Sequence, residues 1–196
     1  MTAIHLLRRL HNCAVAWSDR RLKDWLPGLF ARFVFAAVLL PFFISAFRTK
    51  VEPGFFGFFH IRASAWYQIA LPAVDAAGGD LSQIGPFPWG MIVLLGTYAE
   101  ITLPLLIVFG LFTRIAALGM ICFLAVMSLV DITVHQVDAA TIGALFDRFP
   151  DAVILDQRLL WTIPLVQLAF YGAGAVSLDR LLATLCHVHR PTKTAP

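Results

Sequence analysis

Four apolar stretches of about 20 residues each constrain the fold of this chain more than any other feature of its sequence. A helix of that length rises about 30 Å, which matches the hydrocarbon core of a bilayer, and it satisfies its own backbone hydrogen bonds there. The stretches span residues 29–47, 91–112, 115–134 and 159–176. The sequence therefore predicts an all-α membrane protein built as a bundle of four transmembrane helices.

The composition agrees with this class of protein. Apolar residues make up 59% of the chain and charged residues 14%, whereas soluble domains carry about 25% charged residues. The net charge is only +3, and the basic residues are spread over several loops, so the expected partner is the lipid bilayer and not nucleic acid. The three cysteines lie far apart and imply no disulfide framework.

The distribution of charge among the loops predicts the orientation of the bundle. If four helices alternate in direction, the N-terminal segment, the turn between the second and third helices and the C-terminal tail share one side. Most of the arginines and lysines lie there, whereas the acidic residues concentrate on the other side, which also holds some bases. The positive-inside rule then places both termini in the cytoplasm. The basic residues on the cytoplasmic side are Arg8, Arg9, Arg20, Arg21, Lys23, Arg114, Arg180, Arg190 and Lys193.

The chain divides into a membrane domain and two flanking segments. Residues 1–28 form an amphipathic cytoplasmic segment, in which Leu6 and Leu10 recur at helical spacing. This pattern predicts an interfacial helix on the cytoplasmic leaflet, and a frayed terminus is the alternative. Residues 29–182 form the membrane domain, and residues 183–196 form a cytoplasmic tail.

Two long external loops connect the predicted helices. The first, residues 48–90, is rich in phenylalanine and tryptophan, which are typical of membrane interfaces. It predicts an interfacial helix over about residues 62–76. The second, residues 138–158, predicts a short helix that Asp138 caps.

An acidic residue, Glu100, lies near the middle of the second apolar stretch. A charge at that depth costs about 2.5–3.5 kcal/mol on insertion scales, so the side chain needs a proton, a cation or a role in function. Arg32 in the first helix is the cation that the sequence favours, and Tyr98, Gln167 and Tyr171 are polar companions. Structural stabilisation and a functional intramembrane site are both open interpretations.

A second polar cluster marks the outer end of the third helix. Asp131, His135 and Asp138 recur at i, i+4 and i+7 and therefore share one helical face. His60, in the first external loop, lies on the same side of the membrane. Such a cluster can relay protons, ligate a metal or hydrogen-bond a quinone head group, or it can simply mark where the helix meets water. The spacing fits no defined metal motif, so no metal site is predicted.

Several residues together resemble the DoxX family of bacterial inner-membrane proteins. They are Arg32, Lys50 and Glu100, the hairpin segment "GLFTRIAAL" with Gly110, Thr113 and Arg114, and the closing "GAGAVSLDRLL". The resemblance covers about residues 29–182. It implies a four-helix bundle in the inner membrane, and family members are linked to thiosulfate:quinone oxidoreduction, to oxidant-defence complexes and to operons for copper-binding peptides.

Three functions follow from these features as rival hypotheses. The first is an accessory or quinone-interacting subunit of a redox or stress-response system, with membrane or periplasmic protein partners. The second is a quinone-linked oxidoreductase in which Glu100 or His135 accepts a proton. The third is a small-solute or copper-linked metal transporter or maturation factor, which would need a homo-oligomer because four helices are few for a transporter. The sequence contains no Walker loop, dinucleotide fingerprint or nucleophile elbow, so whether the protein is an enzyme stays open.

Overall fold

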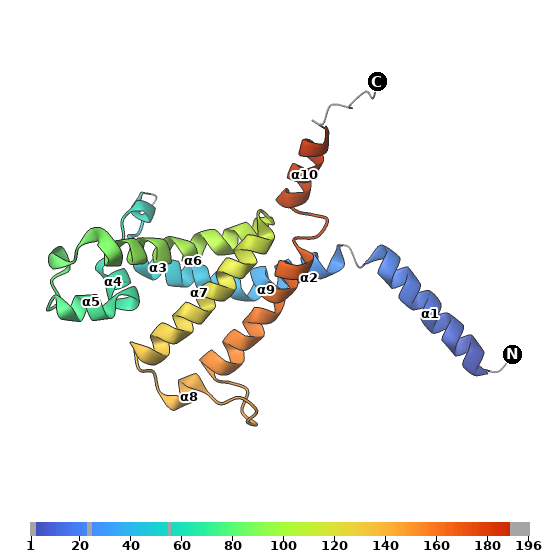
Figure 1. Ribbon diagram of the computed structural model, residues 1–196, viewed down its shortest axis with the longest axis horizontal. Helices are drawn as coiled ribbons and strands as arrows, with labels where there is room; N and C mark the ends of the chain where they lie inside the picture. The colour runs from blue at the N-terminus through green and yellow to red at the C-terminus, as the bar shows by residue number, and fades with distance from the viewer. Residues whose placement is uncertain (1–2, 23–24, 55, 189–196) are drawn as a thin grey trace, which may run out of the picture.

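A computed structural model describes residues 3–22, 25–54 and 56–188. Within these residues the regular structure is helical, apart from one isolated antiparallel bridge between Val51 and Ile61. Four helical segments are long and apolar enough to cross a membrane, and Figure 1 shows them as the body of the molecule. They are Leu26–Lys50, Pro86–Phe109, Thr113–Thr133 and Val153–Tyr171. The predicted fold class is therefore confirmed.

The first span is interrupted by a π-helical turn. It consists of α2 (Leu26–Val34), η1 (Phe35–Leu39) and α3 (Leu40–Lys50), and the N–H of Leu40 bonds to the carbonyl of Phe35, five residues earlier. Pro41 follows at the start of α3 and has no N–H to donate. A wider turn before the proline lets the span continue across this missing donor.

Glycines end the second and fourth spans earlier than their hydropathy predicts. Helix α6 (Met91–Phe109) stops because Gly110 adopts a left-handed conformation, φ 69°, and donates to the carbonyl of Ile107. Helix α9 (Leu159–Tyr171), which follows the π turn η5 (Val153–Arg158), stops at Gly172, φ 77°. The predicted ends at residues 112 and 176 were wrong because the residues beyond each glycine are apolar but not helical. Helix α7 (Thr113–Thr133) forms the third span.

The predicted short helices are present. Residues 62–76 form two helices, α4 (Ala63–Ile69) and α5 (Leu71–Ala76), because the chain leaves the helical conformation at Ala70, φ −126°. Asp138 caps α8 (Ala139–Ile142) by accepting from the N–H of Thr141 at 2.6 Å. The remaining elements are α1 (Ala3–Arg21), η2 (Gly57–Phe59), η3 (Leu81–Gln83), η4 (Pro86–Gly90) and α10 (Leu178–Val188).

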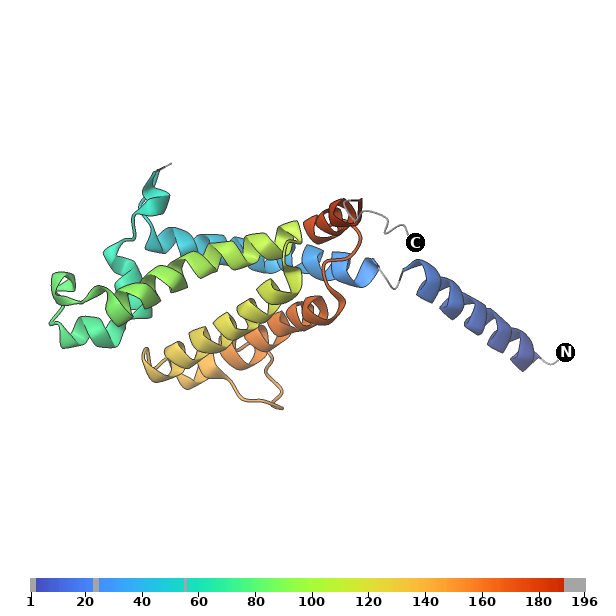
Figure 2. The ribbon, with the colours of Figure 1, turned by 45° about the horizontal axis from the view of Figure 1, so that its top comes forward.

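The spans pack as two pairs that meet at one end of the bundle. Helix α3 lies along α6, α7 lies along α9, and α2 packs on α9. In Figures 1 and 2 the α6–α7 hairpin opens away from its turn. We call the end that holds this turn, the start of α2 and α10 the hairpin end, and the end that holds α4, α5 and α8 the loop end.

Two separate apolar clusters stabilise this arrangement. The larger one joins all four spans and includes Phe35, Phe43, Met120 and Leu165, which are fully buried. The second is smaller and packs α4 and α5 against the first half of α6 around Val93. Helix α6 therefore extends beyond the end of α3 toward the loop end, and α4 and α5 cover this extension in place of a transmembrane neighbour.

Candidate functional site

The buried acid Glu100 forms an ion pair with Lys50. The ammonium of Lys50 lies 2.8 and 2.9 Å from the two carboxylate oxygens of Glu100, and the side chains are 5% and 7% exposed. A third contact of 3.4 Å joins the ammonium to the carbonyl of Ala46. The three N–H donors of Lys50 thus each have an acceptor, and the carboxylate avoids the cost of an unpaired charge.

The course of the chain brings these two residues to the same level. Glu100 is the central residue of α6, nine residues or about 14 Å from either end of the helix. Lys50 ends α3, and the bridge between Val51 and Ile61 then turns the chain back toward α4. The N–H of Arg62 bonds to the carbonyl of Lys50 at 2.8 Å. Lys50 can therefore be the last residue of its span and still face the centre of the next.

Arg32, the cation that the sequence favours for Glu100, is bound elsewhere. Its guanidinium contacts four backbone carbonyls at the hairpin end, among them Ile107 at 3.1 Å and Ala173 at 3.2 Å, together with Val108 and Val176. Ile107 and Val108 lie in the last turn of α6, and Ala173 and Val176 lie in the loop that directly follows α9, so no further helical turn satisfies these carbonyls. The predicted pairing of Arg32 with Glu100 was wrong because Arg32 instead ties two helix ends together.

The predicted polar companions of Glu100 also have other partners. The hydroxyl of Tyr98 donates to the carbonyl of Phe58 at 2.9 Å. The amide of Gln167 donates to the carbonyl of Pro27 at 3.0 Å, and Tyr171 is largely exposed at the hairpin end. Tyr98 and Gln167 therefore anchor loop and helix ends and do not assemble with Glu100.

The predicted cluster of Asp131, His135, Asp138 and His60 contains a second ion pair that the sequence does not predict. Arg158 donates to Asp131 at 2.5 Å and to the hydroxyl of Ser128 at 3.0 Å. The Arg158 side chain is 9% exposed, and its Nε has no hydrogen-bond partner among the described residues. This pair joins α7 to the start of the last span.

The remaining members of the cluster are held by separate backbone groups. Nε2 of His135 lies 3.0 Å from the carbonyl of Gln68 in α4, and Nδ1 of His60 lies 3.2 Å from the carbonyl of Phe56. Asp138 caps α8. Across the described residues, no three His, Cys, Asp or Glu side chains converge as a metal site would require. The four predicted residues therefore do not form one site.

Two of them, however, line a cleft together with the Lys50–Glu100 pair. The cleft measures about 600 Å³ and lies between α3, α4, α6 and α7. Its polar side chains are Lys50, Gln68, Glu100, Asp131 and His135. Its apolar wall consists of Phe42, Ala46, Ile69, Ile92, Leu95, Gly96, Ala99, Leu103, Gly119, Cys122, Phe123, Val126, Met127 and Val130. We call it the central cleft.

The central cleft exists because the α6–α7 hairpin opens toward the loop end, and the contact between His135 and Gln68 bridges the opening. Leu95 of α6 and Val126 of α7 are about 60% exposed, so the cleft has an apolar rim on the lipid side. The Gln68 carbonyl can only accept, so Nε2 of His135 carries the proton of this contact. In the tautomer that carries only this proton, Nδ1 is an acceptor.

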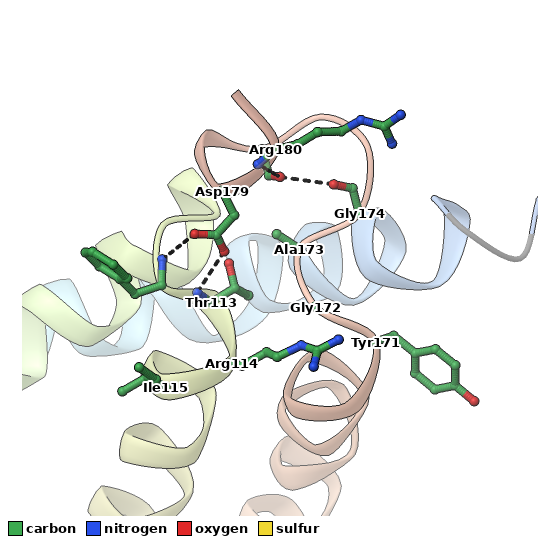
Figure 3. Close-up of a pocket in the computed structure, with 11 residues that line it drawn as sticks. Thr113, Arg114, Ile115, Tyr171, Gly172, Ala173, Gly174, Asp179 and Arg180 are labelled. Atoms are coloured by element: carbon green, nitrogen blue, oxygen red, sulfur yellow. Dashed lines mark hydrogen bonds between the residues drawn. The ribbon is translucent and has the colours of Figure 1, made fainter. Parts of the chain in front are cut away.

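The hairpin residues Gly110, Thr113 and Arg114 lie at the opposite end of the bundle, as Figure 3 shows for the last two. Asp179 of α10 accepts from the N–H groups of Phe112 at 2.7 Å and Thr113 at 3.0 Å, which are the first donors of α7. The "SLD" segment thus supplies two caps. Ser177 caps α10 by accepting from the N–H of Arg180, whereas Asp179 of α10 caps α7.

Sequence reasoning missed several residues of the central cleft, above all Lys50 as the partner of Glu100. Lys50 and Arg158 share a signal that could have identified both as partners of an acid. Each flanks a predicted transmembrane helix, and each side chain is long enough to reach an acidic residue of another helix. Long basic side chains at such positions extend along apolar surface to a polar group. Gln68 and Cys122 gave no comparable signal, because their place in the cleft depends on how α4 and α7 pack.

Comparison with known protein families, curated proteins and solved structures gave no match to this chain.

Proposed function

We propose that this protein is an accessory membrane subunit that binds a quinone in the central cleft, as part of a redox or stress-response system of the DoxX type. The observation that supports the proposal best is the Lys50–Glu100 pair in the wall of an apolar cleft of about 600 Å³. Small-molecule sites are typically concave, mostly apolar and about 300–1,000 Å³ in volume, with few polar groups.

The chemistry of the lining fits a quinone head group. A quinone carbonyl needs a donor, and the ammonium of Lys50 can supply one by giving up its long contact of 3.4 Å to Ala46. A quinol hydroxyl needs an acceptor, which Nδ1 of His135 offers. The isoprenoid tail is apolar and suits the rim formed by Leu95 and Val126, where it can continue into lipid.

The proposal assigns binding, and not electron transfer, to this chain. Electrons would come from a partner protein in the same membrane, and the two protons that reduction of the head group to quinol consumes would pass through Glu100 or Asp131, the carboxyl groups of the cleft. The distribution of charge among the loops favours an inner-membrane orientation with both termini in the cytoplasm. In this orientation the loop end, together with the part of the central cleft near His135, lies on the outer side of the membrane.

The experiment uses Cys122, which lines the central cleft and is exposed. In full-length protein that carries Cys13→Ser and Cys186→Ser, we expect saturating decylubiquinone to slow alkylation of Cys122 by N-ethylmaleimide severalfold. Glu100→Gln and the double variant Lys50→Met/Glu100→Met should lose this protection. The matched control is Arg148→Gln, which removes an exposed charge stacked on Phe149 outside the cleft.

Two results would contradict the proposal. One is an alkylation rate in the wild-type background that does not depend on decylubiquinone. The other is equal protection in the Lys50 and Glu100 variants, which would show that quinone reaches Cys122 from lipid without using the ion pair.

A further inference from the structure

A second cavity lies at the hairpin end, on the far side of the bundle from the central cleft. It measures about 650 Å³ and is bounded by the α6–α7 turn, the loop after α9 and the start of α10 (Figure 3). We call it the hairpin-end cavity. It shares no lining residue with the central cleft, so its role is independent of quinone binding.

Structural contacts hold the hairpin-end cavity open without using its basic side chains. Asp179 caps α7, and the N–H of Asp179 bonds to the carbonyl of Gly110 at 2.8 Å. Arg32 binds the carbonyls of Ala173 and Val176 in the loop after α9. The walls are therefore fixed by one carboxylate and one guanidinium that already have backbone partners.

Two other arginines of the cavity have no such partner. Neither Arg114 nor Arg180 makes a side-chain hydrogen bond or ion pair with another described residue, although both line the cavity. A Cβ atom built on Gly172 would lie 3.5 Å from Nε of Arg114, so this side chain lies against the loop. Figure 3 shows Arg114 extending under the loop toward Tyr171, whereas Arg180 extends past the opposite side of the loop.

A buried hydroxyl adds a third unpartnered polar group. Thr113 is 1% exposed, lines the same cavity, and its Oγ1 has no hydrogen-bond partner among the described residues. Asp179, the one carboxylate in the lining, already accepts two backbone N–H groups. The cavity thus offers two guanidinium groups and a hydroxyl against a single, occupied acid, which favours an anion.

The surroundings of these groups are apolar and exposed. Phe112, Ile115 and Tyr171 border the cavity with exposed fractions of 60%, 73% and 62%. These side chains lie at the ends of membrane-spanning helices, where lipid head groups meet the acyl chains. A ligand that satisfies both parts of the cavity carries a negative head group and an apolar tail.

We propose that the hairpin-end cavity binds the phosphate of an anionic phospholipid head group. Arg114 contacts the phosphate directly, since guanidinium groups bind phosphate oxygens through paired N–H donors. Arg180 adds attraction from the water side, and Ile115 and Tyr171 contact the acyl chains. Basic pockets between transmembrane helices are a known form of lipid recognition.

The test measures binding of dioctanoyl phosphatidylglycerol to the full-length protein in a zwitterionic detergent by native mass spectrometry. A charge near the surface contributes about a fivefold change in affinity, so Arg114→Gln should weaken binding about fivefold. Arg180→Gln should weaken it less, about twofold, because its charge acts through water. Arg148→Gln is the matched control and should bind as the wild type does.

Further binding measurements identify the class of ligand. Dioctanoyl phosphatidylcholine should bind more weakly than phosphatidylglycerol, and inorganic phosphate at millimolar concentration should not displace the lipid. Equal affinity for the two lipids, or unchanged binding by Arg114→Gln, would overturn the proposal, and displacement by inorganic phosphate would reassign the cavity to a free anion. Arg114→Lys, which keeps the charge but not the paired donors, should retain intermediate affinity, and it replaces Arg114→Gln should that variant not fold.

Discussion

The ammonium of Lys50, the last residue of the first span, lies 2.8 Å from the carboxylate of Glu100, the central residue of the second-span helix α6. The two charges neutralise each other at a place where the side chains are only 5% and 7% exposed. Each side chain therefore depends on the other, because removal of one partner leaves a buried charge without compensation.

Substitution of either partner should destabilise the protein strongly, and substitution of both should not. We expect Lys50→Met and Glu100→Gln each to lower the free energy of unfolding by about 3–5 kcal/mol, whereas Lys50→Met/Glu100→Met should lose much less because two apolar side chains replace the pair. Unfolding of the purified protein by SDS titration gives the three values. Additive losses in the double variant would show that the pair contributes no coupling energy.

Gly110→Ala should be more destabilising than Gly78→Ala, although both glycines have a left-handed backbone with φ of 69° and 60°. At Gly110 a Cβ atom would meet Ser177 at 2.7 Å and Arg32 at 3.0 Å, whereas at Gly78 nothing lies within 4 Å. The shared backbone conformation costs about 1–2 kcal/mol for a non-glycine residue. The difference in melting temperature between the two variants therefore reports the close packing at the hairpin end, and equal melting temperatures would contradict it.

Asp179→Ala should weaken the start of α7 and not the start of its own helix. The carboxylate accepts from Phe112 and Thr113, and loss of a cap of this kind costs about 0.5–2 kcal/mol. Hydrogen exchange should show faster exchange at the Phe112 and Thr113 amides. Ser177→Ala is the control, since it removes the hydroxyl that accepts from Arg180 in α10. Faster exchange in α10 alone after Asp179→Ala would refute the cross-helix cap.

The cap of α8 should depend on pH in a defined direction. Two hydrogen bonds from Thr141 hold the pKa of the Asp138 carboxyl below its ordinary value of 3.8. The bond from the backbone N–H has the larger effect, and the bond from the hydroxyl has the smaller one. The cap is therefore fully present above pH 3.8 and is lost as the pH falls through the lower folded-state pKa. The amide shift of Thr141, followed by NMR from pH 7 to pH 2, should titrate with a midpoint below 3.8. Asp138→Asn should abolish that titration, and a midpoint above 3.8 would contradict the assignment.

The number and approximate extent of the transmembrane helices could be predicted because hydropathy over about 20 residues is a local property. The short helix capped by Asp138 could also be predicted, since caps act on amides within a few residues. The ends of the transmembrane helices were predicted less accurately. Gly110 and Gly172 stop their helices through backbone conformation, which hydropathy does not register.

The partners of the charged residues could not be predicted in the same way. Arg32 stands within the first span and Lys50 at its end, and the sequence favoured Arg32 as the partner of Glu100, whereas the structure pairs Glu100 with Lys50. The choice follows from how far α6 extends past α3, which depends on the packing of α4 and α5 around Val93. The predicted helical face of Asp131, His135 and Asp138 was likewise wrong, because α7 ends at Thr133 and leaves His135 beyond the helix. Asp131 and His135 therefore contact Arg158 and Gln68 from different segments.

The sequence by itself determined that this chain forms four membrane-spanning helices and that an acid stands at the centre of the second, because apolar length and residue identity act locally. Only the tertiary structure decided that Lys50 neutralises this acid, that Arg32 joins two helix ends, and that the α6–α7 hairpin leaves room for two cavities. These features depend on the relative position of segments 50 or more residues apart, and no local pattern fixes that position.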